Sequence, residues 1–392
     1  MSELKSLKRE EPNYFGAGPA LLPTDVLTKA AYDLLSYDND IIGIGEISHR
    51  SKPATAVIDD TKQNLRTLMN IPDNYEIFFL QGGGTTAFSV IPYNLFANYA
   101  KRTGKKGRAA YAVTGTWSAK AVEEAKRLGF EADVVINTKN SNYGDIPNYT
   151  SWEPIKEDTA YLWVCDNETV NGNEFFDTPG EEYLPKNVEL VADMSSNILS
   201  KKIDVSKYGL IMAGAQKNIG IAGLTIYIIR KDLLDQATDA ELRKLDIALV
   251  PIAYDFPMVV KNNSAYNTIP LFTCQILKLV TEKLINEQGI ANIQKINDKK
   301  AKLLYGVLDK YSNFYRLPVT NPKVRSKMNV VFKTPSEDLD AKFVKEAEAA
   351  NLKGLKGHRS VGGIRASIYN AVSYTSVEKL ANFVEEFAKN NT

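Results

Sequence analysis

Short apolar segments alternating with longer amphipathic ones are the feature of this 392-residue sequence that most restricts its fold. Several of the short segments, Tyr161–Cys165 among them, are apolar at nearly every position. Such strands are buried on both faces, which is typical of a mainly parallel sheet covered by helices. Strands are predicted at Glu76–Leu80, Ala109–Val113, Ala132–Ile136, Tyr161–Cys165, Glu189–Ala192, Leu210–Ala213 and Leu224–Ile229.

Helical segments separate the first of these strands and define the layers of the fold. The pattern predicts a helix at Ser89–Ala100, between the first two strands, and another at Ala119–Leu128, after the second. Strand–helix–strand order of this kind predicts a three-layer α/β/α domain around a mainly parallel seven-stranded sheet. We expect this large domain to occupy residues 16–270.

The last third of the sequence has a different pattern. Helices are expected at about 271–287 and 294–311, followed by a strand at Lys327–Phe332, a helix near 339–351 and a closing helix. Thr375 and Glu378 have the spacing of a capping box at the start of that closing helix. We expect a smaller α+β C-terminal domain at residues 271–392, joined by residues 1–15.

Charge and cysteine content restrict the partners and the compartment. With 48 basic and 47 acidic residues, the chain has no net field that would attract nucleic acid or an anionic membrane. No apolar run approaches the length of a membrane-spanning helix, and the charged N-terminus lacks the apolar core of a signal peptide. Cys165 and Cys274 cannot form a disulfide framework or a four-thiolate metal site. We expect a cytoplasmic protein that acts on small molecules.

Polar residues follow the predicted strands where a ligand would bind. In open parallel sheets, ligands bind outside the carboxyl ends of the strands. The segments that follow five of the strands are Gln81–Thr86 (QGGGTT), Thr114–Trp117 (TGTW), Asp166–Thr169 (DNET), Asp193–Ser196 (DMSS) and Gly214–Lys217 (GAQK). One edge of the sheet therefore offers a glycine loop, an indole, carboxylates, hydroxyl groups and a lysine.

Each of these elements also has a purely structural explanation. Three glycines before a helix can hold an anion or form a tight turn, and their spacing matches neither the dinucleotide fingerprint nor the P-loop. Taken alone, Trp117 is a packing residue, Asp193 a helix cap and Lys217 a surface charge.

Together, however, these elements are the parts that hold pyridoxal phosphate. The glycine loop would bind the phosphate, and Lys217 would form the Schiff base, which requires a partly neutral amine. Asp193 would pair with the pyridine nitrogen, so that the ring accepts electrons from the substrate. The indole of Trp117 would stack on that ring.

The two histidines of the chain begin the same tripeptide, His49-Arg50-Ser51 and His358-Arg359-Ser360. Arginine supplies a planar pair of donors for carboxylate or phosphate, and histidine adds another donor. Arg365 follows a few residues later. These residues suit a substrate with two anionic ends, whereas two histidines without acidic or thiol neighbours make an incomplete metal site. We therefore expect no metal.

Several of these motifs resemble those of the phosphoserine aminotransferases, class-V aminotransferases of the pyridoxal-phosphate-dependent fold type I, and in particular of a fungal member. The resemblance covers essentially the whole chain. It rests on FGAGPA (15–20), GIGEISHRS (43–51), LQGGGTTAF (80–88), VTGTWS (113–118), the pair Asp193 and Gln216-Lys217, KNNSAYNTIP (261–270) and KGHRSVGGIRASIYNA (356–371).

The resemblance implies a homodimer with active sites at the subunit interface, and it implies roles for individual residues. Lys217 and Asp193 would be catalytic, with the remaining cofactor contacts from Gly84, Thr85, Trp117, Thr169 and Gln216. Asn267 and Thr268 would bind the phosphate of the neighbouring subunit's cofactor, although on sequence alone they read as a turn and cap. The substrate would be bound by His49, Arg50, His358, Arg359 and Arg365, with Arg365 on the α-carboxylate.

One position departs from the family pattern. Many bacterial members have an arginine directly after the triple glycine, where this chain has Thr85. One contact to the distal anionic group of the substrate is therefore missing, and the two His-Arg pairs must supply that recognition.

The implied reaction transfers the amino group of L-glutamate to 3-phosphohydroxypyruvate, which gives 2-oxoglutarate and O-phospho-L-serine in serine biosynthesis. Other class-V enzymes, such as serine–glyoxylate or alanine–glyoxylate aminotransferase, remain alternatives. A cysteine desulfurase fits poorly, because neither Cys165 nor Cys274 lies on a suitable loop. A catalytically silent binding protein would not need both Lys217 and Asp193, and a dehydrogenase would need a different glycine motif.

Overall fold

A computed structural model describes residues 9–180 and 182–392 of the chain. Within these residues, seven strands form one sheet in the order β1-β9-β8-β7-β4-β2-β3. Their bounds are β1 Tyr75–Gly82, β2 Arg108–Val113, β3 Ala132–Asn137, β4 Thr159–Cys165, β7 Glu189–Asp193, β8 Leu210–Gly214 and β9 Gly223–Arg230. All seven predicted strands are confirmed, with ends that differ by at most one or two residues.

The sheet is mainly parallel, as predicted. Neighbouring strands from β8 to β3 pair in parallel, whereas β9 is antiparallel to both β8 and β1. β9 follows β8 after a connection that contains no helix, so the chain returns beside β8 in the opposite direction. β1 therefore runs the same way as the parallel strands, and its carboxyl end lies at their edge of the sheet.

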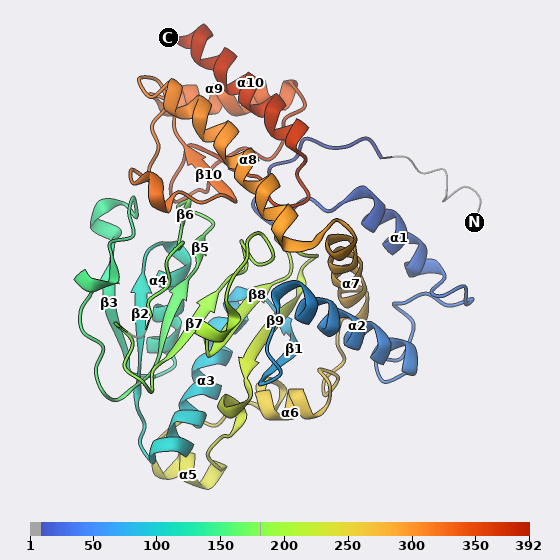
Figure 1. The fold of residues 1–392 in the computed structure, drawn as a ribbon, viewed down its shortest axis with the longest axis vertical. Coiled ribbons are helices and arrows are strands. Elements are labelled where there is room, and N and C mark those ends of the chain that lie inside the picture. Colours follow the sequence, from blue (N-terminus) through green and yellow to red (C-terminus); the bar gives the residue numbers. More distant parts are fainter. Residues whose placement is uncertain (1–8, 181) are drawn as a thin grey trace.

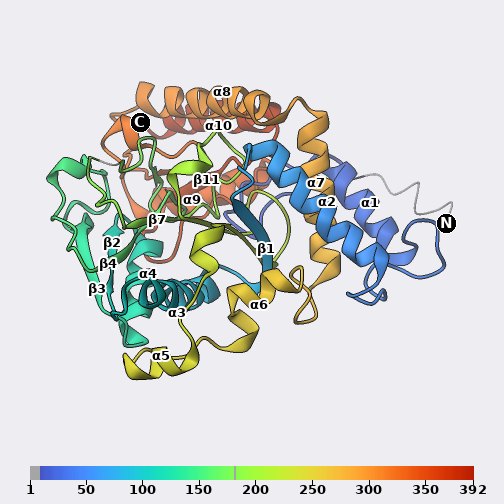
Figure 2. The same ribbon diagram turned by 60° about the horizontal axis from the view of Figure 1, so that its bottom comes forward.

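Helices cover both faces of the sheet, because alternate residues along each strand point to opposite sides. Phe78 and Leu80 of β1 join one apolar core, with residues of the helices α3 and α4. Ile77 and Phe79 join another, with residues of α2 and α7. The helix bounds are α2 Lys52–Met69, α3 Gly84–Thr103, α4 Thr116–Arg127 and α7 Leu271–Asn286. This arrangement is the predicted three-layer α/β/α architecture (Figures 1 and 2).

The remaining elements of the described residues are short or C-terminal. Three further helices are α1 Thr24–Leu35, α5 Asp239–Lys244 and α6 Phe256–Lys261, and β5 Asn167–Glu168 pairs with β6 Asn173–Glu174. The C-terminal elements are α8 Gly289–Lys310, β10 Asn329–Phe332, α9 Glu337–Ala349, β11 Ile364–Ser367 and α10 Tyr374–Asn391. Figure 1 shows α8, α9 and α10 grouped beyond one end of the sheet, around the antiparallel pair β10–β11.

The predicted capping box of the closing helix is wrong. Ser373 is the N-cap of α10, with extended backbone angles and a side chain that accepts a hydrogen bond from Ser376 N at 3.1 Å. Thr375 lies inside the helix, so its hydroxyl cannot cap it. A serine two residues earlier makes the same bond with the same geometry, and the spacing alone could not distinguish the two.

The C-terminal elements have an apolar core of their own, which also contains Phe15 and Leu21. Phe15 N donates to Lys353 O at 2.8 Å, and Ser367 N donates to Phe15 O at 3.0 Å. α7, in contrast, contributes its buried residues to a core of the large sheet. The division into 16–270 and 271–392 remains a prediction, and residues 1–8 of the joining segment lie outside the described residues.

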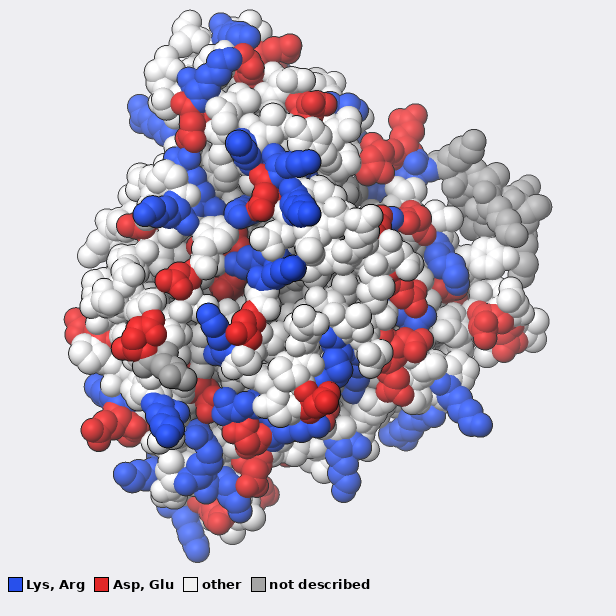
Figure 3. All heavy atoms as spheres, viewed as in Figure 1, with Lys and Arg blue, Asp and Glu red and all other residues white. Residues whose placement is uncertain are grey.

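The surface of the described residues is polar and mixed in sign. On the face shown in Figure 3, basic and acidic side chains are interspersed over most of the surface. Every helix in the described part of the chain is too short or too polar to cross a membrane. The same residues contain no cluster of three or more histidine, cysteine or acidic side chains that could hold a metal ion.

Lys300 connects α8 to the segment that follows β11. Its side chain is fully buried, and Nζ donates hydrogen bonds to the carbonyl oxygens of Ile368, Tyr369 and Val372 at 3.0, 2.8 and 3.0 Å. In this segment, Asn370 N donates to Asn218 Oδ1 at 2.9 Å. The buried amino group of Lys300 thus holds a loop that reaches the residue next to Lys217.

Replacing Lys300 by methionine should lower the free energy of unfolding by about 3 kcal/mol, because three buried carbonyl groups lose their partner. Burial lowers the pKa of Lys300 to about 7, from the ordinary 10.5 that it regains on unfolding. The unfolded chain then binds more protons between these pH values, so the contribution of Lys300 to stability rises from pH 7 to 10.5 and is lost as pH falls.

Urea unfolding of the cofactor-free protein at pH 6.5 and 9.5 measures both effects. The difference between wild type and Lys300→Met should grow at the higher pH. Lys302→Met, an exposed lysine of the same helix, is the control and should change stability by less than about 0.5 kcal/mol. Equal stabilities of wild type and Lys300→Met at both pH values would contradict the role assigned to the Lys300 amino group.

Candidate active site

The structure brings the predicted loops together at one edge of the sheet. The carboxyl ends of β1, β2, β4, β7 and β8 lie at this edge, because these strands run in the same direction. The glycine loop follows β1, and Lys217 follows β8. The short strand pair β5–β6 begins two residues after β4 and carries Thr169 in its turn.

Lys217 is buried at this edge, with 9% of its surface exposed. Its Nζ donates to Thr169 Oγ1 at 2.7 Å and lies 5.3 Å from the centroid of the Trp117 ring. Burial lowers the pKa of Lys217, and the negative charge of Asp193 opposes this change while the positive charge of Arg365 reinforces it. A lowered pKa increases the neutral fraction of the amine, which is the nucleophilic and basic form.

Asp193 is the last residue of β7, next to β8, and is buried. Its Oδ1 accepts hydrogen bonds from Ser195 N at 2.9 Å and Ser195 Oγ at 2.6 Å. Ser195 Oγ in turn accepts from Gly214 N at 3.0 Å. One oxygen of the carboxylate therefore caps the turn after β7, in line with the capping role considered for Asp193 from the sequence. In the described part of the chain Oδ2 accepts no hydrogen bond, so that oxygen can bind a ligand.

Trp117 lies in the first turn of α4, whose N-cap residue, Gly115, has no side chain that could accept from the first N–H groups. Glu168 supplies the missing acceptors: Oε2 accepts from Trp117 N at 2.9 Å, and Oε1 from Ser118 N at 2.8 Å and Ser118 Oγ at 2.6 Å. Asn171 Oδ1 accepts from Thr116 N at 2.9 Å. Sequence analysis assigned no role to Glu168. Its partners are about fifty residues away, so no local pattern marks it.

α3 begins differently, because its N-terminus has no side-chain acceptor. Gly83 is the N-cap, with no side-chain hydrogen bond. A Cβ atom at Gly83 would meet nothing within 4 Å, so open space lies beside it. Gly84 and Thr85 are the first residues of this 20-residue helix. Free N–H groups at the positive end of a helix bind phosphate, so this N-terminus, and not that of α4, fits an anion.

Asn267 and Thr268 lie beside the glycine loop of their own chain and are exposed. Asn267 Nδ2 donates to Gln81 Oε1 at 2.9 Å, and Gln81 Nε2 donates to Thr268 O. Asn267 Oδ1 also accepts from Thr268 N at 2.9 Å, the turn that their sequence suggested.

Gln216 joins the N-terminal segment to the lysine loop. Its backbone oxygen accepts from Ala20 N at 3.0 Å. A Cβ atom at Gly18 would lie 3.0 Å from Lys217 Cγ, and Gly18 has a φ of +136°. Glycine at position 18 thus lets the backbone approach Lys217 closely, which explains part of the FGAGPA motif.

Arg365 lies near Lys217, because both side chains contact Thr169. Arg365 lies in β11, and its Nη1 donates to Thr169 O at 3.3 Å. Burial lowers the pKa of His358, and the charges of Arg365, Arg359 and Lys120 lower it further. These cations are therefore within electrostatic range of the His358 ring. In the described residues neither arginine forms an ion pair, which leaves both able to bind an anion.

The first His-Arg pair is separate from this group. His49 and Arg50 lie in the connection between α1 and α2, where Ser51 caps α2 by accepting from Ala54 N at 3.4 Å. His49 Nε2 is buried without a hydrogen-bond partner among the described residues. No hydrogen bond, ion pair or ring contact in residues 9–180 and 182–392 joins His49 or Arg50 to another predicted site residue. The serine of the second tripeptide contacts its own histidine instead, at 2.7 Å.

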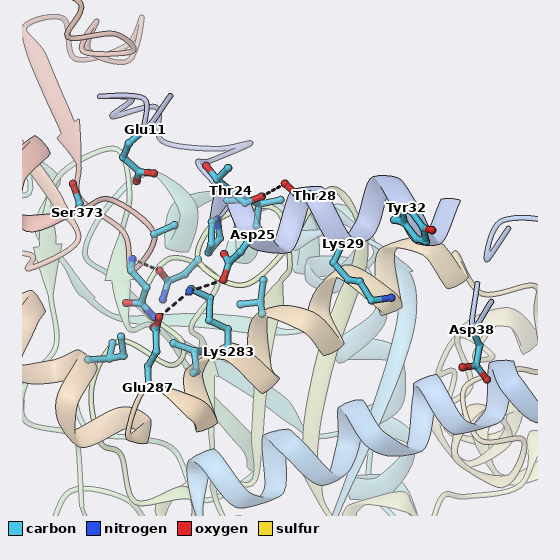
Figure 4. Close-up of a pocket in the computed structure, with 18 of the residues that line it drawn as sticks. Glu11, Thr24, Asp25, Thr28, Lys29, Tyr32, Asp38, Lys283, Glu287 and Ser373 are labelled. Atoms are coloured by element: carbon cyan, nitrogen blue, oxygen red, sulfur yellow. Dashed lines mark hydrogen bonds and ion pairs between the residues drawn. The ribbon is translucent and has the colours of Figure 1, made fainter. Parts of the chain in front are cut away.

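A cavity of about 1200 Å³ lies elsewhere, between α1, α7 and the segment before α10 (Figure 4). Lys283 pairs there with Asp25 and Glu287, each at 2.8 Å, so the ammonium group is already occupied by two carboxylates. Of the residues lining the cavity, Asn218 is the sequence neighbour of Lys217, but none of the predicted site residues lines it. The candidate site is therefore the edge of the sheet around Lys217 and not this larger cavity.

The sequence as a whole matches one protein family. The model of the family described as aminotransferase class-V matches residues 13–380. The chain therefore belongs to the class-V aminotransferases, which confirms the fold class and the enzyme class expected from its motifs.

The individual proteins that this chain resembles point to one group within this class. Phosphoserine aminotransferase of Saccharomyces cerevisiae is 54% identical and covers 98% of this chain and 100% of its own length. The structure of phosphoserine aminotransferase from Bacillus circulans subsp. alkalophilus has a TM-score of 0.89 at 38% identity, and covers 98% of this chain and 100% of its own. The pyridoxal-phosphate-bound phosphoserine aminotransferase from Trichomonas vaginalis has a TM-score of 0.85 at 36% identity, with coverage of 96% and 100%. Within class V, the chain thus groups with the phosphoserine aminotransferases.

Glu168→Gln should disturb the start of α4. A glutamine has one acceptor where the carboxylate has two, and its NH₂ group would face an N–H group of the first turn. We expect a loss of about 1–3 kcal/mol in the free energy of unfolding and a changed environment of the Trp117 ring.

The fluorescence of Trp117 reports its environment. It is obtained for wild type and for each variant as the difference between the emission spectra with Trp117 and with Trp117→Phe. Glu123→Gln, on the exposed side of α4, is the matched control and should leave that emission unchanged. If Glu168→Gln behaves like the control in emission and in stability, Glu168 does not hold this turn.

Proposed function

We propose that this chain is a phosphoserine aminotransferase that transfers the amino group of L-glutamate to 3-phosphohydroxypyruvate, by a ping-pong mechanism, in cytoplasmic serine biosynthesis. The observation that carries the proposal is the buried amine of Lys217, held by Thr169 beside Trp117, with Arg365 bound to the same Thr169 and free of a carboxylate partner in the described residues. The identity to phosphoserine aminotransferases over the whole chain supports the same substrate class.

The residues present fit pyridoxal phosphate. The uncapped N-terminus of α3 is open to a phosphate, and one oxygen of Asp193 is free for a cationic ring nitrogen. The indole Nε1 of Trp117 is buried without a partner among the described residues, so the ring is placed by packing and not by its polar atom. When bound, pyridoxal phosphate supplies an electron-accepting ring and carries the amino group between the two halves of the reaction.

With pyridoxal phosphate bound, four residues of this chain would have distinct roles in the reaction. Nζ of Lys217 takes the proton from the substrate Cα, for which its lowered pKa provides the neutral form. Thr169 orients this amine through the 2.7 Å hydrogen bond. Asp193 holds the ring nitrogen protonated, and Trp117 covers the ring and excludes water.

Recognition of the substrate depends on the cations around Lys217. Arg365 is close enough to Lys217 to lower its pKa, and we assign it to the α-carboxylate that every amino-acid and keto-acid substrate carries. His358 and Arg359 are assigned to the distal phosphate. Charge-assisted hydrogen bonds to a phosphate strengthen with each added donor, so a bulkier dianion needs several of them.

We also propose that the enzyme is a homodimer in which His49, Arg50, Asn267 and Thr268 act on the partner's site. The connection between α1 and α2, which carries His49 and Arg50, also exposes 93% of the surface of Ile41. Exposed apolar side chains beside unpartnered polar ones are typical of an interface. Asn267 and Thr268 are exposed beside the glycine loop, where a second subunit could reach them.

The half-reaction with glutamate tests the proposed activity. The purified enzyme should absorb visible light through its bound cofactor, and L-glutamate alone should bleach that band. 3-Phosphohydroxypyruvate should restore it far more efficiently than glyoxylate. Lys217→Ala should lose multiple turnover completely, and Asp193→Asn should bind cofactor but exchange the Cα proton of glutamate at least about a hundredfold more slowly.

Two results would overturn the assignment. Multiple turnover by Lys217→Ala would exclude this lysine as the catalytic base. A wild-type enzyme that prefers glyoxylate would move the chain to the alternative class-V aminotransferases.

Mixed dimers test the assignment of Arg50 to the partner's site. Arg50→Ala alone should lose roughly ten- to a hundredfold in kcat/KM for the phosphorylated keto acid. Co-expression of Arg50→Ala with Lys217→Ala should recover about a quarter of wild-type activity, because half of the dimers are mixed and each mixed dimer has one intact site. No recovery would place Arg50 in the site of its own chain, and an active monomer in sedimentation would exclude the dimer.

A further inference from the structure

Lys120 is a cation at the candidate site that none of the motifs includes. It lies one turn after Trp117 in α4, so both side chains are on the same face of the helix. Its Nζ is 4.9 Å from the centroid of the Trp117 ring, and Nζ of Lys217 is 5.3 Å from the same centroid. Two ammonium groups therefore lie beside one indole, but Lys217 is buried and Lys120 is exposed.

The usual partner of a lysine in this position is already occupied. Glu124 is four residues after Lys120, the spacing at which helical ion pairs form. Glu124 instead accepts from Arg127 at 2.6 and 2.8 Å and from Ser89 Oγ at 2.6 Å. Glu123 forms no ion pair with Lys120 either. Lys120 has no hydrogen bond and no ion pair within the described residues, so its ammonium remains free beside Trp117.

The same ammonium belongs to a group of cations without carboxylate partners. Its charge, with those of Arg359 and Arg365, acts on the ring of His358. The Lys120 ammonium, placed beside the Trp117 ring, is thus within electrostatic range of the His358–Arg359 pair. The acidic side chains of the site, Asp193 and Glu168, make hydrogen bonds to Ser195 and to the first turn of α4. Within the described residues, neither carboxylate forms an ion pair with Lys120, Arg359 or Arg365.

We propose that Lys120 is a specificity-determining residue whose ammonium binds the distal phosphate of the keto-acid substrate together with the His358–Arg359 pair. The proposal rests on the proposed function. A phosphate ester carries close to two negative charges at neutral pH, more than one arginine neutralises. Lysine suits this position because its flexible stem carries a compact charge that can follow the phosphate as the substrate enters.

A purely structural alternative is that Lys120 only stabilises the Trp117 ring by a cation–π contact. The two roles differ in what they discriminate. Support of the ring would affect phosphorylated and unphosphorylated keto acids equally, since both react at the same ring. Binding of the phosphate would affect only the phosphorylated one.

The test uses the holoenzyme with Lys120→Met, which keeps the stem and removes the charge, and Lys120→Arg, which keeps the charge. Lys126→Met, an exposed lysine of the same helix, is the matched control. For Lys120→Met we expect kcat/KM with 3-phosphohydroxypyruvate to fall roughly tenfold, mainly through KM, with a much smaller change for hydroxypyruvate. Lys120→Arg should restore most of the loss, and Lys126→Met should match wild type.

Binding of an unreactive pair provides a measurement that does not depend on turnover. Calorimetric titration with 3-phosphoglycerate and with glycerate should give a roughly tenfold weaker Kd for 3-phosphoglycerate in Lys120→Met, and a similar Kd for glycerate. Equal losses on both members of each pair, or no loss, would overturn the proposal. A wild-type enzyme without preference for the phosphorylated keto acid would instead overturn the proposed function, whatever Lys120 does.

Discussion

The burial of the Lys217 amine is the constraint on which the rest of the site depends. An ammonium group removed from water becomes costly unless a carboxylate pairs with it, and the partner in contact here is the neutral Thr169 hydroxyl at 2.7 Å. Asp193 is near enough to oppose the fall in pKa but makes its hydrogen bonds to Ser195. The amine therefore stays reactive because no carboxylate forms a hydrogen bond with it in the described residues. A glycine is needed at position 18, because there the backbone approaches the Lys217 side chain closely.

The N-termini of two helices, α3 and α4, lie at this edge, and only that of α4 is capped by side chains from elsewhere in the chain. α4 has its first N–H groups satisfied by Glu168 and Asn171, which come from the loop after β4. α3 has none of its own satisfied by a side chain. Because a capped helix end is no longer available to an anion, the capping of α4 fixes Trp117 in place and leaves the N-terminus of α3 as the one of the two that is open to an anion. Glu168 and Thr169, adjacent in sequence, thus hold the ring and the amine from one short turn.

Sequence reasoning succeeded where a property repeats along the chain. All seven strands of the sheet were predictable, since burial on both faces leaves a continuous apolar run such as Tyr161–Cys165. The polar segments at the strand ends could be grouped because parallel strands end at one edge. It failed where one residue contacts another far away in sequence. The buried cap supplied by Glu168 and the three carbonyl contacts of Lys300 have no local signature, and the true cap of α10 differs from an equally spaced candidate by two residues.

Local charge at the site also could not be read from composition. The chain carries a formal net charge of only +1, yet Lys120, Arg359 and Arg365 form no ion pairs in the described residues. Elsewhere on the same helix Arg127 and Glu124 form an ion pair, so Glu124 is not available to Lys120. Unpaired like charges repel and lower the stability of the folded chain. Their persistence beside Lys217, a buried lysine with a lowered pKa, is accounted for if the missing negative charges arrive with the substrate. In that case binding relieves a repulsion that the free enzyme carries.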